Sequence, residues 1–76
     1  RLIAKDVNWV SIPEPKGEIK TTAKIRYRAE QARATLTPRD NNRVEVVFEK
    51  PQRAITKGQS VVFYKNNLLL GGGMID

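Results

Sequence analysis

Apolar and polar side chains alternate over several short stretches of the chain. Residues 19–28 show the clearest alternation, with mostly apolar side chains at odd positions and lysine, arginine or threonine at even positions. A period of two with β-branched content is typical of a strand with one buried and one solvated face. Residues 43–49 follow the same pattern, and Val44, Val46 and Phe48 are expected to point inward. Shorter strands are predicted at residues 34–37, which Pro38 ends, and at residues 61–64, 68–70 and 74–75.

Turn-forming residues separate the predicted strands. Asn66 and Asn67 predict a tight hairpin, since asparagine tolerates positive φ, and residues 40–42 predict a second turn. Prolines and a glycine make residues 11–17 an irregular loop, and residues 29–34 are too short for a stable helix, so a loop or one turn is expected there. Short strands at near-regular spacing predict an all-β fold, a small closed antiparallel β-barrel similar to translation-factor-type barrels. Closure of the sheet removes exposed strand edges.

The size of the chain allows one small domain, residues 1–76. Because it begins at Arg1 rather than methionine, we expect it to be a fragment of a larger protein. No apolar run is long enough to cross a bilayer, and the first ten residues lack a signal-peptide core. We therefore expect a cytoplasmic location, with which the absence of cysteine is compatible.

The residue types of a catalytic or metal site are scarce. The chain has no cysteine and no histidine, which removes the commonest nucleophile–base pairs and metal ligands, so we predict no catalytic residue and no metal. Glu45 and Glu49 are expected on the solvated face of their strand, as partners for lysine or arginine rather than as an acid–base pair. The glycines at residues 71–73 lack the lysine and Ser/Thr of a phosphate-binding loop, so we expect a bend or bulge where backbones pass closely.

The charge of the chain favours a polyanionic partner. Fourteen lysines and arginines against eight acidic residues give a net charge of +6, which suits nucleic acid first and a membrane surface second. The alternative is a solvated barrel exterior without a partner. Along the polar face of residues 19–28, alternate side chains stand roughly 7 Å apart and can reach successive phosphates. These cations are Lys20, Lys24, Arg26 and Arg28.

A few single residues add to this binding hypothesis. Arg26 can grip a phosphate with two hydrogen bonds. Tyr27 can stack on a base, but the alternation points it inward, so packing in the core is an equal alternative. Gln59 follows a glycine at a predicted turn, where its amide can contact a ribose or phosphate or can instead close the turn. Arg53 is a second candidate at the barrel rim, and Trp9 is expected to pack in the core or as a lid.

Several segments, in order and at the family's spacing, resemble the C-terminal domain of the tRNA-specific 2-thiouridylases (the MnmA/TrmU family). They are DVNWV (6–10), KIRYR (24–28), PQRAITKGQS (51–60), VFY (62–64) and LGGG (70–73). The likeness covers nearly the whole chain, and the combination of segments is specific although each is weak alone. One departure is Lys57, where the family pattern usually has proline before Gly-Gln.

The resemblance implies a parent enzyme with an N-terminal ATP-pyrophosphatase-type domain, a small central domain and a C-terminal β-barrel. The first domain binds ATP, activates C2 of the wobble uridine of tRNA by adenylation and carries persulfide sulfur on cysteines. The ATP motif and the cysteines have no counterpart here, so we expect no cofactor in this fragment and ATP only in the parent. In the family the barrel helps to hold tRNA, and the contacts carried over are Arg26, Tyr27 and Gln59. Weaker candidates for tRNA contact are Lys24, Arg28 and Arg53.

The sequence thus predicts a tRNA-positioning module of a 2-thiouridylase, with the anticodon arm of tRNA and the catalytic and central domains as partners, and no membrane. An alternative is a structural or protein-docking barrel that braces the catalytic domain or receives a sulfur-carrier protein. The apolar content of residues 61–70 favours that alternative. A further alternative is a translation-factor-like barrel that binds RNA in another setting.

Overall fold

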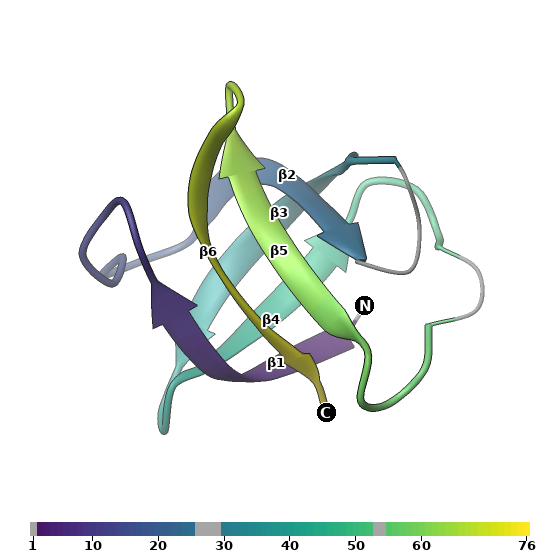
Figure 1. Cartoon of the computed structure of the whole chain (residues 1–76), viewed down its shortest axis with the longest axis horizontal. Helices are drawn as coiled ribbons and strands as arrows, with labels where there is room; N and C mark the ends of the chain where they lie inside the picture. The colour runs from purple at the N-terminus through teal and green to yellow at the C-terminus, as the bar shows by residue number, and fades with distance from the viewer. Residues whose placement is uncertain (1, 26–29, 53–54) are drawn as a thin grey trace.

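The computed structural model describes residues 2–25, 30–52 and 55–76, which form a closed antiparallel β-barrel (Figure 1). The strands are β1 (Leu2–Trp9), β2 (Ile19–Ile25), β3 (Ala32–Arg39), β4 (Arg43–Phe48), β5 (Ser60–Lys65) and β6 (Leu68–Ile75). Around the barrel they follow the order β1-β4-β3-β2-β5-β6, and β6 pairs with β1 to close the sheet. The predicted fold class is confirmed. Among the described residues there is no helix long and apolar enough to cross a membrane.

Most strands lie where the alternation predicted them. In β2, Thr21, Ala23 and Ile25 are buried, whereas Lys20 is exposed and Lys24 is half-buried on the opposite face. The last residues of that predicted strand, 26–28, lie outside the described residues. In β4, the predicted inward residues are buried or pack against the core, and β6 joins the two short strands predicted near the C-terminus.

β3 begins earlier than predicted. Residues 32 and 33 were expected in a loop or a single turn, but they pair with Ala23 and Thr22 on β2. The prediction was wrong because the local composition suits a helix, while strands on both sides supply backbone partners that override local propensity.

β3 also continues through Pro38, which was expected to end it. Proline lacks an amide hydrogen and is tolerated in a strand only where no neighbour needs that hydrogen. β2 begins at Ile19, opposite Leu36, so no β2 residue lies opposite Pro38. The strand can therefore run to Arg39 without losing a hydrogen bond within the sheet.

β1 was not predicted as a strand, and a bulge explains why. Leu2 and Ala4 are buried two residues apart, but the next buried residue is Val7. Between them Asp6 has a φ of 52°, and the pairing with β6 shifts by one residue between Lys5 and Asn8. The inserted residue reverses which positions point inward, so strict alternation fails along this stretch although it is a strand throughout.

The glycines of β6 lie where three backbones pass closely, as predicted. A Cβ added at Gly72 would stand 2.6 Å from the carbonyl oxygen of Val61 on β5. A Cβ added at Gly73 would stand 2.6 Å from the carbonyl oxygen of Lys5 on β1, and one at Gly71 would collide with a β1 carbonyl. Any side chain there would push β6 away from its neighbours.

The core fills the barrel interior with aliphatic side chains around one aromatic residue. The largest fully buried side chains are Phe63, Leu36, Leu70, Val44, Val46 and Val61. Trp9 is partly buried, and its ring centroid lies 5.8 Å from that of Phe63. Trp9 therefore packs against the core, as the sequence predicted.

Glu45 is buried, which contradicts the expectation that it lies in solvent. Only 7% of the residue is exposed, although its neighbours Val44 and Val46 point to the core on the other face of β4. The guanidinium of Arg39 on β3 donates a hydrogen bond to its carboxylate, and this pairing offsets part of the cost of burying the charge. Glu49, just after β4, is exposed as expected.

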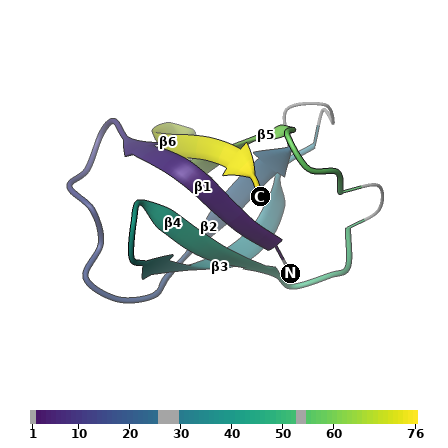
Figure 2. The same cartoon turned by 90° about the horizontal axis from the view of Figure 1, so that it is seen from below.

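Two rims bound the barrel (Figure 2). At the rim that we call the terminal rim, β1, β3 and β5 begin and β2, β4 and β6 end. The opposite hairpin rim holds the loop after β1 and the turns joining β3 to β4 and β5 to β6. There Lys65 pairs with Leu68, and Asn66 and Asn67 have φ values of 50° and 68°, which confirms the predicted tight hairpin.

Candidate nucleic-acid interface

Four of the predicted tRNA contacts, Arg26, Tyr27, Arg28 and Arg53, lie outside the described residues. The roles of these four residues stay predictions. What the structure adds is the described surface of the barrel exterior and of the terminal rim.

Gln59 lies at the terminal rim and closes a turn with Thr56. The amide hydrogen of Gln59 is donated to the carbonyl of Thr56 over 3.3 Å, and the amide of Thr56 donates to Oε1 of Gln59 over 3.1 Å. Gly58 has a φ of 87°, which gives the type II turn that glycine permits. The Gln59 carbonyl also accepts the amide hydrogen of Ile75 over 2.8 Å. The side-chain oxygen of Gln59 thus stabilises the turn, and its side-chain NH₂ group is the part suited to an RNA contact.

Lys24 and Lys20 share the outer face of β2, as the alternation predicted. Lys24 is half-buried beside β5, where its Cα partner is Val62. Lys20 is exposed four residues earlier, about 13 Å along the strand. Two of the predicted cations therefore line one strand of the barrel exterior.

A hollow of about 430 Å³ lies on the outer face of β2 and β3 and reaches the end of β5. Three cations line it from three different strands, namely Lys20 of β2, Arg33 of β3 and Lys65 of β5. Glu49 is its only carboxylate among the described residues. Threonine hydroxyls and the Asn66 amide supply further polar groups. We call this surface the cationic hollow.

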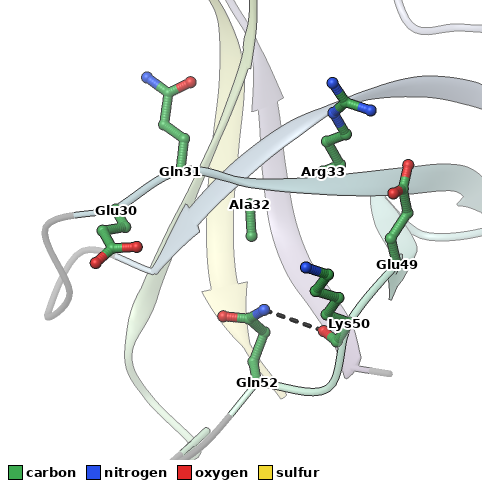
Figure 3. A pocket seen from close by; sticks show the side chains of 7 residues that line it. All are labelled: Glu30, Gln31, Ala32, Arg33, Glu49, Lys50 and Gln52. Atoms are coloured by element: carbon green, nitrogen blue, oxygen red, sulfur yellow. Dashed lines mark hydrogen bonds between the residues drawn. The ribbon is translucent and has the colours of Figure 1, made fainter.

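A larger groove of about 680 Å³ adjoins the cationic hollow (Figure 3). It lies between the start of β3 and the segment after β4, and Arg33 and Glu49 line both cavities. Its lining residues are Glu30, Gln31, Ala32, Arg33, Glu49, Lys50 and Gln52. Among these described residues, the two cations and the two carboxylates balance one another, so we call it the neutral groove.

Backbone and side-chain hydrogen bonds hold the neutral groove in shape. The amide of Glu49 donates to the carbonyl of Arg33 over 3.0 Å, which ties the two walls together. Nε2 of Gln52 donates to the carbonyl of Lys50 over 3.0 Å (Figure 3). The hydroxyl of Thr22 donates to Oε1 of Gln31 over 2.8 Å, so the NH₂ group of Gln31 stays available as a donor.

Sequence reasoning missed Arg33, Lys50 and Lys65 as members of this surface. Arg33 was assigned to a loop, so it was given no face, and Lys50 and Lys65 follow the ends of the strands predicted from the sequence. Only the pairing of β2 with β3 and β5 brings Arg33 and Lys65 beside Lys20. Knowledge of strand order, which alternation within one strand does not contain, was the missing signal.

Three apolar residues are exposed together at the hairpin rim. Leu68 and Leu69 are 51% and 39% exposed, and Val10 is 60% exposed. The amide of Val10 donates to the carbonyl of Leu70 over 2.8 Å, which places Val10 beside the start of β6. We call these three residues the apolar corner.

The described residues contain no group of three or more His, Cys, Asp or Glu side chains that could hold a metal ion. Beside the carboxylates of Glu30 and Glu49, the described polar groups of this face include cations, amides and hydroxyls. Such groups serve as hydrogen-bond donors to phosphate oxygens and to nucleotide edges. The arrangement suits the binding of a polyanion.

The comparisons with known proteins identify the family. The chain matches the family described as the aminomethyltransferase β-barrel domain over residues 1–75. It is 63% identical over 75 residues to the tRNA-specific 2-thiouridylase MnmA 1 of Clostridium tetani, and 56% identical to the tRNA-specific 2-thiouridylase MnmA of Clostridium perfringens and of Clostridium beijerinckii. Each match covers 99% of this chain and 21% of the relative, so the chain spans about a fifth of the length of these curated relatives. The chain belongs to the aminomethyltransferase β-barrel domain family, and the resemblance to the C-terminal β-barrel of the tRNA-specific 2-thiouridylases is thereby confirmed.

Proposed function

We propose that this barrel positions tRNA for a 2-thiouridylase by holding the anticodon arm while the reaction takes place elsewhere in the parent protein. The observation that carries the proposal is the 63% identity over 75 residues to a protein named tRNA-specific 2-thiouridylase. The net charge of +6 and the cationic hollow support a polyanionic ligand on the barrel itself.

In the proposed parent enzyme, tRNA is held by the barrel and the chemical reaction takes place in the catalytic domain. ATP in its catalytic domain supplies the adenylating group that activates C2 of the wobble uridine, which then receives sulfur from a cysteine persulfide. The barrel contributes no reacting group and no cofactor site. Its contribution is orientation, because contacts that fix the arm of the tRNA remove translational and rotational freedom before the chemical step. This work takes place in the cytoplasm.

Arg26, Tyr27 and Gln59 are the principal contacts in this proposal, and Lys24, Arg28 and Arg53 are secondary ones. Arginine binds phosphate through two parallel hydrogen bonds, and the tyrosine ring can stack on an unpaired base. For Gln59 the contact is made by its NH₂ group, since the oxygen is bonded to the amide of Thr56.

The test is the binding and thiolation of tRNA by the full-length protein carrying Arg26→Ala or Gln59→Glu. The glutamate variant keeps an oxygen for the Thr56 amide but loses the NH₂ donor, so it separates the turn from the RNA contact. Loss of a phosphate contact should weaken tRNA affinity about fivefold at 0.1 M salt, because each contact contributes a salt exponent of about 0.7. KM for tRNA should rise by the same factor, while kcat changes little.

Lys16→Ala is the matched control, because Lys16 lies in the loop at the hairpin rim and its loss changes net charge by the same amount. Wild-type affinity and KM in both Arg26→Ala and Gln59→Glu would contradict the assigned contacts.

A second candidate function is protein docking, which the apolar corner favours. Exposed leucine and valine side chains grouped at one rim are typical of an interaction surface when they are contiguous. The partner in this candidate is a sulfur-carrier protein or the catalytic domain of the parent.

The two candidate functions predict different effects of salt on binding. Capture of a sulfur-carrier protein that survives 1 M salt and is lost in Leu68→Gln would support docking, because apolar contacts resist salt and phosphate contacts do not. Val47→Gln is the control, since Val47 is 43% exposed on β4, away from the hairpin rim. Capture that disappears at high salt would argue against docking through the corner.

A further inference from the structure

We propose that the outer face of β2 and β3 binds an unpaired nucleotide of the RNA, with its phosphate in the cationic hollow and its nucleoside in the neutral groove. This inference rests on the proposed function, and it adds residues of the outer face of β2 and β3 that the proposed function does not use. The ligand class is single-stranded RNA, such as the loop of a hairpin.

The distribution of charge assigns the two parts of the nucleotide. The cationic hollow has three cations and one carboxylate, so it attracts a phosphate. The described residues of the neutral groove carry balanced charges and include two amide side chains, Gln31 and Gln52, which suit the neutral, hydrogen-bonding edges of a base or a ribose. The two cavities share Arg33 and Glu49, so a phosphate and its own nucleoside can occupy them together.

The strand register brings the cations within reach of one phosphate group. Lys20 is paired with Thr35, two residues from Arg33 on β3, so Lys20 and Arg33 are diagonal neighbours roughly 7–8 Å apart. A phosphate between them can accept hydrogen bonds from both side chains, and the guanidinium can bind two of its oxygens. Lys65 approaches from β5, the other neighbour of β2.

The cations of the hollow are not committed to other charges within the described part of the chain. The ion pairs found there join Lys5 to Asp76 and Arg39 to Glu45. Neither pair includes Lys20, Arg33 or Lys65, so these cations can exchange their hydration for phosphate oxygens. The hollow is therefore ready for an anion without the breaking of an existing salt bridge.

The neutral groove requires an unpaired nucleotide. A base in a duplex is stacked between its neighbours and hydrogen-bonded to its partner, so it cannot enter a cavity on a barrel exterior. A loop nucleotide can turn its base outward, where the NH₂ group of Gln31 and the amide of Gln52 can contact its edges. Gln31 is oriented for this by the hydrogen bond that its oxygen accepts from Thr22.

The test measures equilibrium binding of labelled tRNA to the full-length protein over a series of salt concentrations. Lys20→Ala, Arg33→Ala and Lys65→Ala should each weaken binding about fivefold at 0.1 M salt and reduce the salt exponent by about 0.7. The double variant Gln31→Ala/Gln52→Ala should weaken binding about tenfold with an unchanged salt exponent, because it removes neutral hydrogen bonds. It should also reduce the preference for a hairpin competitor over a fully paired duplex of the same stem.

Lys5→Ala is the control for net charge. Lys5 lies on β1, three strands from β2 around the six-stranded barrel and hence on the opposite side. Losses in the hollow variants no larger than in Lys5→Ala would overturn the inference, since the effect would then be one of overall charge. So would normal binding in every hollow and groove variant.

The outcomes separate this inference from the proposed function. If Arg26→Ala or Gln59→Glu weakens tRNA binding while the hollow and groove variants do not, the proposed function stands and the inference fails. If no variant of the barrel changes tRNA binding, both fail. Thermal unfolding of each variant shows whether the fold is retained before its binding is interpreted.

Discussion

Thr56 and Gln59 hydrogen-bond to each other in both directions across one turn: the Gln59 amide donates to the Thr56 carbonyl, and the Thr56 amide donates to the Gln59 side-chain oxygen. The turn has Lys57 at its second position and Gly58 at its third, where φ is positive. Backbone bonds from this turn to Ile75 also fix it against the end of β6. The Gly-Gln dipeptide is thus explained by the geometry of the terminal rim, independently of any contact with RNA.

Replacement of Lys57 by proline should stabilise the barrel. Proline presets the φ that the second position of a type II turn requires, and the described backbone hydrogen bonds do not use the Lys57 amide. We expect a gain of about 0.4–1 kcal/mol from the reduced entropy of the unfolded chain. Thermal unfolding followed by circular dichroism should show Tm higher by about 2–8 °C. A lower Tm would mean that the turn is not of this type.

Alanine at Gly73 should destabilise the barrel, whereas alanine at Gly17 should not. The added Cβ at position 73 meets the Lys5 carbonyl at 2.6 Å, while the one at position 17 meets nothing within 4 Å. Overpacking against backbone costs about 1–3 kcal/mol. Denaturant titration of the two variants compares the same chemical change in crowded and open surroundings. Equal stability of the pair would contradict the close approach of β6 to β1.

The stability of variants at Asp6 should depend on the backbone conformation that the new residue tolerates, and not on its charge. Asp6 is exposed and has a φ of 52°, in the left-handed region that glycine and asparagine tolerate and β-branched residues avoid. Asp6→Gly and Asp6→Asn should stay within about 0.5 kcal/mol of wild type, and Asp6→Val should lose about 1–2 kcal/mol. Chemical denaturation measures these differences. A valine variant as stable as the asparagine variant would show that β1 has no bulge at this position.

The same bulge marks the limit of what the sequence predicts about the fold. Alternation correctly identified β2 and β4, and the apolar run at residues 61–64 correctly identified β5. Alternation failed for β1, where one inserted residue reverses the inward positions, and for the start of β3, where pairing with two neighbours overrides the local composition. Turn chemistry was a better guide, since the asparagine pair at residues 66–67 specifies its hairpin locally.

The site was predictable only where it depends on one strand. Lys20 and Lys24 follow from the alternation of β2 alone. Arg33 and Lys65 join them through strand order, which depends on contacts between residues far apart in the sequence. Glu45 shows the same limit for burial, since it faces away from the core but is covered by Arg39 from the next strand. Burial by a side chain from a neighbouring strand cannot be predicted from the pattern of residues along one strand.

Ultraviolet crosslinking of tRNA to the full-length protein, with the crosslinked peptides identified by mass spectrometry, tests most directly whether this barrel holds tRNA. We expect crosslinks within residues 1–76, concentrated on peptides from β2, β3 and the terminal rim, with few from β1. Crosslinks confined to the rest of the protein, with none in these residues, would contradict the proposal that the barrel positions the RNA.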